Sequence, residues 1–419
     1  MLNKFNNSDK KVAILVGGTT LAQLITIFLT PILSRIYRPE DFGLFAIFFS
    51  ITGILSIIIG GRYEVAIVQP KKNSEAIILA LISFALMLLL TIILTFILFL
   101  TYENIFISQG INKKLFLFIP IMSFFIGLFN ILNILNTRFE NYKSISIAKI
   151  LRSIFQNSIP IFLSFFSINA INILIGYFGG FIATYFSLVK KNFFKKNRIS
   201  KFSKENFFYN LKKYKVFPLY NAPASIANKI THQLPFIFIL FIGGEAINGL
   251  YFLAARLISI PTALIGESFS QVFYRDVSAK INQNSKILPL LKNSIKKLFL
   301  IAFPVFILIF FLSPTFFPLF LGEEWTDSGI IAQYLGFIFL IQFVVSTVSQ
   351  LLSIKKFVFR GAFWKYLYLI TSLILYSFSY YLNIDFYTFL LFLVIHEYIL
   401  YSIYLYLIYE AAVNHDLAV

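Results

Sequence analysis

Long, nearly continuous runs of apolar residues recur along the whole chain and are separated by short polar segments. A run of about 20 apolar residues matches the hydrocarbon thickness of a bilayer. Inside a bilayer, only helices and closed barrels satisfy every backbone polar group. The runs are continuous rather than alternating, which favours helices over barrel strands. The pattern therefore predicts an all-α integral membrane protein.

The apolar runs predict twelve transmembrane helices, six on each side of a basic segment. They cover residues 12–33, 43–61, 75–100, 114–136, 149–167, 170–189, 216–242, 246–272, 295–321, 328–353, 361–382 and 385–408. The basic segment, residues 190–215, contains interspersed Phe and Tyr, which is typical of an amphipathic helix lying on the inner leaflet. Residues 43–46 read GLFA and residues 249–252 read GLYF, each at the outside start of the second helix of its half. This short match indicates a parallel repeat, which is common in transporters.

Composition agrees with lipid as the solvent for most of the chain. Hydrophobic residues make up 58% of it and charged residues only 13%, whereas soluble domains carry about 25% charged residues. The first apolar run is too long for a signal-peptide core, so we interpret it as a retained helix. The absence of cysteine excludes disulfides, iron–sulfur clusters and Cys-ligated zinc, and three widely spaced His residues predict no metal site. No Walker-type or dinucleotide-binding pattern occurs, so we expect no cofactor.

Basic residues are distributed unevenly between the two sides of the predicted membrane. With the N-terminus inside, the cytoplasmic segments hold 30 of the 36 Lys and Arg residues. The outside loops hold only Arg35, Arg38, Lys113 and Lys114. This positive-inside bias predicts that both termini are cytoplasmic. The net charge of +18 is therefore a topology signal, with anionic lipid headgroups rather than nucleic acid as its neighbours.

The predicted helix at 216–242 carries a one-sided polar face. Its polar residues recur at helical spacing, and they are Asn221, Ser225, Asn228 and His232. Lys229 lies beside this face near mid-span, and Pro218, Pro223 and Pro235 make a straight helix improbable. The pattern predicts a moving wall of an aqueous cavity, and a buried hydrogen-bond network is the alternative.

The next helix carries two charged residues, Arg256 and Glu267, on one face. Three helical turns separate them, about 16 Å, so they do not pair with each other. The planar fork of an Arg suits phosphate oxygens, and Lys229 offers a second positive charge. We expect Lys229 and Arg256 to bind an anionic group. The alternative is that Arg256 pairs with a carboxylate on another helix.

Three other groups of polar residues are candidates for a transport pathway. The first helix carries a polar face that either binds sugar hydroxyls or holds helices together, formed by Thr19, Gln23, Thr26 and Thr30. At the cytoplasmic end of the second helix, Arg62 and Glu64 are either a gate ion pair or interfacial anchors.

In the twelfth helix, His396 and Glu397 are either a proton-coupling site or a hydrogen-bonded packing pair. Glu267 is a further candidate for gating or coupling. Glu40 and Asp41 stand just before a helix, where acids favour the helix dipole.

Three segments resemble the O-antigen flippases of the multidrug/oligosaccharidyl-lipid/polysaccharide (MOP) exporter superfamily. They are TPILSRIYRPEDFGLFAIFFSITGILSIIIGGRYEVAIVQP at 30–70, FPLYNAPASIAN at 217–228 and FPLFLGEEWTDSGIIAQYL at 317–335. The resemblance implies a MATE-like fold with two six-helix lobes, at 1–189 and 216–419, joined by the linker at 190–215. It also implies alternating access around a central cavity lined by the first, second, seventh and eighth helices.

The resemblance further implies a cargo and a location. The cargo would be an oligosaccharide on undecaprenyl pyrophosphate, moved from the inner to the outer leaflet of a bacterial cytoplasmic membrane. Expected partners are the bilayer, this lipid-linked substrate, a coupling H⁺ or Na⁺, and other polysaccharide assembly proteins. A cation-coupled drug or metabolite exporter of the same superfamily is the first alternative. A polysaccharide polymerase or glycosyltransferase is the second, and the short outside loops count against it.

Overall fold

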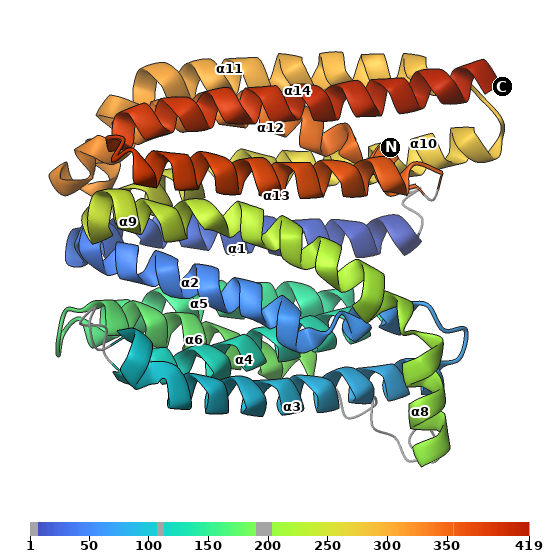
Figure 1. Ribbon diagram of the computed structural model, residues 1–419, viewed down its shortest axis with the longest axis horizontal. Helices are drawn as coiled ribbons and strands as arrows, with labels where there is room; N and C mark the ends of the chain where they lie inside the picture. Colours follow the sequence, from blue (N-terminus) through green and yellow to red (C-terminus); the bar gives the residue numbers. More distant parts are fainter. Residues whose placement is uncertain (1–6, 107–112, 190–202, 355, 419) are drawn as a thin grey trace. The chain divides into compact units, whose positions relative to one another are not determined.

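The computed structural model describes residues 7–106, 113–189, 203–354 and 356–418. These residues form helices and connecting turns, with no strand among them (Figure 1). In the first half of the chain the helices are α1 (Asn7–Ile36), α2 (Pro39–Gly60), α3 (Asn73–Phe106), α4 (Lys113–Arg138), α5 (Tyr142–Leu163), α6 (Ala170–Leu188) and α8 (Lys204–Lys213). In the second half they are α9 (Ala222–Pro261), α10 (Glu267–Asn282), α11 (Leu288–Leu321), α12 (Thr326–Val348), α13 (Val358–Tyr381) and α14 (Phe386–Ala418). The predicted all-α fold is confirmed.

Ten segments of the described chain are long and apolar enough to cross a membrane. One of them, Phe217–Asn282, is 66 residues long and covers both the seventh and the eighth predicted helices. Within it, α9 is broken at Gly244, whose φ of 75° and ψ of −174° are not helical. The predicted fifth helix is also present as α5, although its low hydropathy keeps it out of the ten apolar segments. Each of the twelve predicted ranges therefore coincides with helix.

Several predicted helix ends are wrong, because helices continue beyond the apolar run that reveals them. α5 begins at Tyr142 rather than 149, and α11 begins at Leu288 rather than 295. Helix eight extends through α10 to Asn282 rather than 272, and α14 reaches Ala418 rather than 408. At α11 a polar cap supports the extension: Asp416 accepts hydrogen bonds from the backbone N–H groups of Ile287 (2.7 Å) and Leu288 (3.0 Å).

The chain forms two compact units. The first comprises Met1–Ile36 and Ile47–Gln233, and the second comprises Tyr37–Ala46 and Leu234–Val419. In the predicted linker, residues 190–202 lie outside the described residues, and Lys204–Lys213 forms α8. The membrane orientation and the proposed lobe limits remain predictions.

In the first unit, α8 lies across the end of α3 (Figure 1). Phe207 and Leu211 pack against the apolar core that α3, α4 and the short helix Tyr63–Val68 form. The Tyr63 hydroxyl donates a hydrogen bond to the Leu211 carbonyl over 2.8 Å. Lys213 pairs with Glu75 at 3.2 Å, and this hydrogen bond raises the pKa of the Lys213 amine. The described part of the linker is thus fixed to the first unit.

In the second unit, the start of α2 crosses the part of α9 that follows the break at Gly244. A Cβ atom at Gly43 would overlap the Glu245 carbonyl, and one at Gly249 would overlap the Pro39 carbonyl. The two backbones therefore touch where the sequence reads GLFA and GLYF. Asn248, fully buried, donates a hydrogen bond to the Gly43 carbonyl over 3.2 Å.

Aromatic side chains pack around this crossing. Phe45 and Phe252 meet edge to face, with ring centroids 5.5 Å apart. Phe42 meets the fully buried Trp325 in the same way at 5.3 Å. Two of the segments that carry the family resemblance, 30–70 and 317–335, therefore contact each other through Phe42 and Trp325.

Candidate functional site

The polar face predicted for helix seven is left uncovered within the first unit. Helix seven starts with one π-helical turn, Phe217–Asn221, which accommodates Pro218. The buried side of the helix contains Ala222, Ala227 and Thr231. The predicted face is instead half-buried or exposed, at Asn221, Ser225, Asn228 and His232. A cavity along this face remains a prediction.

Lys229 lies on α9 in the first unit, against α2. Its Nζ is 5.9 Å from the centre of the Phe49 ring. A Cβ atom at Gly53 would come within 3.0 Å of the Lys229 Cε, so this glycine makes room for the side chain. Among the described residues, no carboxylate lies within ion-pair distance of its Nζ. A half-buried ammonium without an acid carries a desolvation cost that an anionic ligand would offset.

Arg62 joins the end of α2 to the start of helix seven. The chain reverses at Gly61 and Arg62, whose φ values of 57° and 60° are left-handed. The Arg62 guanidinium lies 3.5 Å from Glu64 Oε1 and donates a hydrogen bond to Asn221 Oδ1 over 3.2 Å. Ser225 also donates to Asn221 Oδ1, over 3.3 Å. Four predicted residues therefore form one hydrogen-bonded group in the first unit.

Glu64 is the buried member of this group, with 4% of its surface exposed. Burial raises the pKa of its carboxyl above the ordinary value, although Arg62 acts in the opposite direction. Its Oε2 atom has no hydrogen-bond partner among the described residues. The partner of Arg62 is thus a neighbour in its own unit, and the gate remains a prediction.

The polar face of helix one contacts α5. Lys149 donates a hydrogen bond to Thr19 Oγ1 over 2.8 Å, and Thr26 and Ser153 share one of 2.7 Å. Thr30 is 2% exposed and bonds to the Thr26 carbonyl, whereas Gln23 is half-buried. The Thr19 and Thr26 hydroxyls therefore hold helices together, and sugar binding by this face remains a prediction.

Two basic residues of α5 were not predicted as site residues. Lys149 and Arg152 lie at the start of the predicted helix 149–167 and are counted among the basic residues of the cytoplasmic side. The Arg152 guanidinium carbon lies 3.9 Å from the centre of the Phe181 ring and 5.6 Å from that of Tyr177. A signal was present in the sequence, since the polar residues of α5 recur with helical spacing at Ser146, Lys149, Ser153 and Asn157.

Arg256 and Glu267 belong to the second unit. Arg256 is half-buried on α9, beyond the break at Gly244. Glu267 is the first residue of α10, directly after a π-helical turn at Thr262–Gly266, and its side chain lies outside the described residues. Lys229 and Arg256 therefore belong to different units, and a joint anion site remains a prediction.

His396 and Glu397 lie in a buried polar cluster between α13 and α14. Tyr368 donates a hydrogen bond to Glu397 Oε1 over 2.6 Å, and His396 Nδ1 is 3.8 Å from the same oxygen. His396 Nε2 shares a hydrogen bond of 3.0 Å with Thr371. Glu397 Oε2 and His396 Nδ1 have no hydrogen-bond partner among the described residues. The cluster has the carboxyl and imidazole groups that a proton site requires, and also those of a packing pair.

The acids before α2 act as a helix cap. Glu40 and Asp41 lie in the first turn of α2, and Asp41 Oδ2 accepts a hydrogen bond from the backbone N–H of Arg38 over 3.2 Å. The capping interpretation is thereby confirmed. Within the described ranges, no group of three or more His, Asp or Glu side chains is placed to hold a metal ion.

Three solved structures share this fold over nearly the whole chain. An outward-facing conformation of a multidrug resistance MATE family transporter of the MOP superfamily has a TM-score of 0.63 at 14% identity, covering 96% of both chains. An inward-facing conformation of a MATE family transporter has a TM-score of 0.61 at 15% identity, covering 95% of this chain and 93% of that one. A MATE structure in complex with MaL6 has a TM-score of 0.62 at 14% identity, covering 96% of both chains.

At these identities the likeness establishes the fold: this is a multi-pass membrane protein with the MATE-like fold of MOP transporters. Residues 32–330 match the family described as "Polysaccharide biosynthesis protein". The chain belongs to that family, and the resemblance seen in its sequence is confirmed. No curated protein matches it.

Proposed function

We propose that this protein is a flippase. It moves an oligosaccharide linked to undecaprenyl pyrophosphate, an O-antigen or capsule repeat unit, from the cytoplasmic to the outer leaflet of a bacterial cell membrane. Family membership supports a role in polysaccharide biosynthesis, and the fold supports transport. The N-terminal lobe at 1–189 and the C-terminal lobe at 216–419 would move relative to each other in alternating access, with both termini in the cytoplasm.

The observation that carries the proposal is the environment of Lys229. This ammonium lies near mid-span in helix seven, over Gly53 and Phe49, with no carboxylate in ion-pair distance among the described residues. A cationic drug would be repelled from such a place, whereas a pyrophosphate would offset the desolvation cost of the ammonium. Arg256 is the second proposed pyrophosphate ligand, because its planar fork matches phosphate oxygens.

The test is restoration of surface glycan in flippase-deficient strains at matched expression. Wild type is compared with Lys229→Gln, Arg256→Gln and Lys229→Arg, and the exposed Lys215→Gln is the matched control. Loss of one charge-assisted contact of about 1.5–3 kcal/mol predicts a decrease in flipping of roughly ten-fold or more. Lys229→Arg keeps the charge and should retain part of the activity, and Lys215→Gln should behave as wild type.

Each outcome bears on a different part of the proposal. If both Gln variants match wild type, the pyrophosphate assignment is wrong. If wild type fails in donor strains that cover several glycan types, the cation-coupled drug or metabolite exporter becomes the better explanation. That exporter would need an essential acid, so Glu267→Gln or Glu397→Gln would abolish export while Lys229 and Arg256 would be dispensable. A polymerase or glycosyltransferase would instead depend on Glu40 or Asp41, the only adjacent acids in an outside loop before helix nine.

Coupling is proposed to use a proton held by His396 and Glu397. The unpartnered Glu397 Oε2 and His396 Nδ1 atoms support this, because each is an atom that can take up a proton. The Glu397 carboxyl is surrounded by four phenols, those of Tyr251, Tyr368, Tyr376 and Tyr401. Glycan export that does not change with the external pH in wild type, or that keeps its pH dependence in Glu397→Gln, would remove the coupling role.

A further inference from the structure

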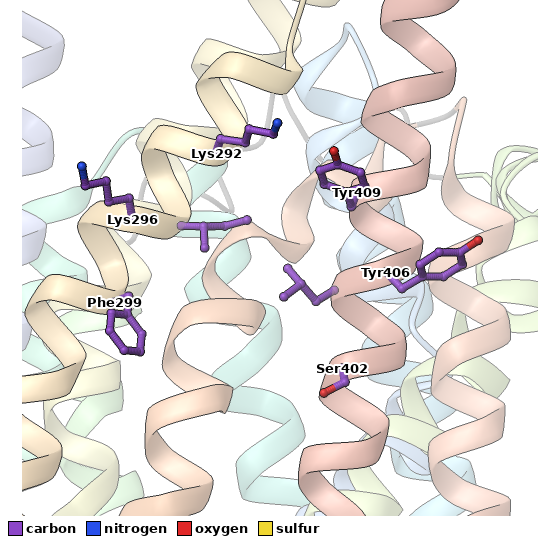
Figure 2. Close-up of a pocket in the computed structure, with 8 residues that line it drawn as sticks. Lys292, Lys296, Phe299, Ser402, Tyr406 and Tyr409 are labelled. Atoms are coloured by element: carbon purple, nitrogen blue, oxygen red, sulfur yellow. The ribbon is translucent and has the colours of Figure 1, made fainter.

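A groove opens on the second unit between α11 and α14, at the end where α11 begins and α14 ends. It has a volume of about 610 Å³, within the roughly 300–1,000 Å³ of ligand pockets. Figure 2 shows Lys292, Lys296 and Phe299 on one wall and Ser402, Tyr406 and Tyr409 on the other. Ile295 and Leu405 complete the lining.

The groove is polar at one end and apolar at the other. Lys292 extends toward Tyr409 and places its Nζ 5.8 Å from the centre of the Tyr409 ring, while Lys296 turns outward one turn later (Figure 2). Further along α11, the groove is lined by Phe299, which is 46% exposed. The apolar run of α11 begins directly after the lysines, at Leu298. A charged end followed by an apolar trough is the outline of a phospholipid at the membrane interface.

Among the described residues of the unit, the positive charge of this end is not compensated. The nearby acids are engaged elsewhere: Glu410 pairs with Arg360 at 3.1 Å, and Asp416 caps the backbone of α11. Among the described residues, no carboxylate lies within ion-pair distance of Lys292 or Lys296. The lining itself contains two lysines and no acid. An anion therefore fits the mouth of the groove.

Lipid is the neighbour that the outer faces of both helices require. α11 and α14 are each apolar enough to span a membrane. Large apolar side chains stay exposed along them, with Leu300 at 62% and Phe311 at 69% on α11, and Ile395 at 49% and Ile399 at 56% on α14. Exposed apolar surface of this extent on spanning helices faces acyl chains.

We propose that this groove is a binding site for an anionic phospholipid of the surrounding bilayer. Its phosphate lies at Lys292, Lys296 adds positive charge one turn away, and one acyl chain runs along Phe299 and Leu405. Because each lysine near an anionic lipid contributes about 1 kcal/mol, each is expected to raise the affinity about five-fold, and both together roughly 25-fold.

The experiment is native mass spectrometry of the purified full chain with equimolar phosphatidylglycerol and phosphatidylcholine. Lys292→Gln/Lys296→Gln is compared with Lys286→Gln/Lys297→Gln, which removes the same charge from exposed positions outside the groove. A third variant, Ser402→Trp, fills the groove and keeps both lysines. Size-exclusion profiles check that each variant is folded.

The proposal expects wild type to bind phosphatidylglycerol preferentially. The groove double variant should lose roughly 25-fold in that binding, the control should change less than two-fold, and Ser402→Trp should also bind weakly. Equal losses in both double variants would mean a diffuse surface charge and would overturn the site. So would undiminished binding to Ser402→Trp. Displacement of the lipid by soluble glycerol phosphate would show that a free phosphate, not a lipid, is the ligand.

Discussion

The contact between Gly43 and Gly249 supports a prediction with a built-in control. In Gly249→Ala, the new methyl group would overlap the Pro39 carbonyl oxygen, which belongs to the backbone and cannot rotate away. α2 and α9 must then separate where they now touch. Gly17→Ala makes the same chemical change in α1, where nothing lies within 4 Å of the new Cβ.

The magnitude follows from three contributions. Replacing Gly by Ala within a helix gains up to about 1 kcal/mol at either position. Overpacking at Gly249 costs about 1–3 kcal/mol. Separation of the helices also breaks the bond between Asn248 and the Gly43 carbonyl, which leaves buried polar groups unpaired at a cost of about 1–3 kcal/mol. The net expectation for Gly249→Ala is a loss of about 3 kcal/mol, and for Gly17→Ala no loss.

The assay is thermal unfolding of the detergent-solubilised protein, followed by intrinsic fluorescence. Gly249→Ala should unfold several degrees below wild type, and Gly17→Ala at or above it. Gly43→Ala should behave like Gly249→Ala, because its methyl group would overlap the Glu245 carbonyl at the same crossing. Equal stability of Gly249→Ala and Gly17→Ala would refute the close approach of the two backbones.

Three further predictions concern buried or capping acids. Because the folded-state pKa of Glu64 lies above its unfolded value of 4.5, folding favours the protonated carboxyl. Its stabilisation is full below pH 4.5 and is lost as pH rises through the folded-state pKa. The unfolding temperature of Glu64→Gln should therefore rise relative to that of wild type as pH increases. A difference in unfolding temperature that stays constant with pH would contradict this. Asp416→Ala should cost about 1–2 kcal/mol by uncapping α11, with Asp416→Asn closer to wild type in the same thermal assay. Tyr368→Phe leaves Glu397 Oε1 without its donor and should cost about 1–3 kcal/mol of stability. Tyr381, which is 80% exposed, is the control, and Tyr381→Phe should cost nothing. Equal unfolding temperatures of the two variants would show that the Tyr368 hydrogen bond does not stabilise the protein.

The positions and order of the helices could be predicted from the sequence, because bilayer thickness imposes a length on every apolar run. The family resemblance could be recognised for a related reason: segments such as 30–70 and 317–335 keep their order along the chain. Helix ends could not be placed as well. At the start of α11, Asp416 satisfies the backbone N–H groups of Ile287 and Leu288, and hydropathy does not register that cap.

The candidate site was only partly predictable. Helical spacing alone revealed the polar faces of helices one and seven. It did not reveal that Thr19 and Thr26 would bond to α5, or that Arg62 would reach Asn221. Lys149 and Arg152 were missed as site residues because basic residues at a helix end are expected at the membrane surface, whereas Thr19 and the Phe181 ring hold these cations inside a helix bundle.

The sequence by itself thus determined where along the chain the helices lie, though not their ends, and which side of a helix is polar, since both follow from local periodicity. Only the tertiary structure decided which neighbouring helix each polar face contacts. It brought Gly43 to Gly249, Phe42 to Trp325, and Lys292 to Tyr409, pairs separated by many residues in the chain. The physical reason is that such contacts depend on the close packing of whole helices, and no single segment encodes its neighbour.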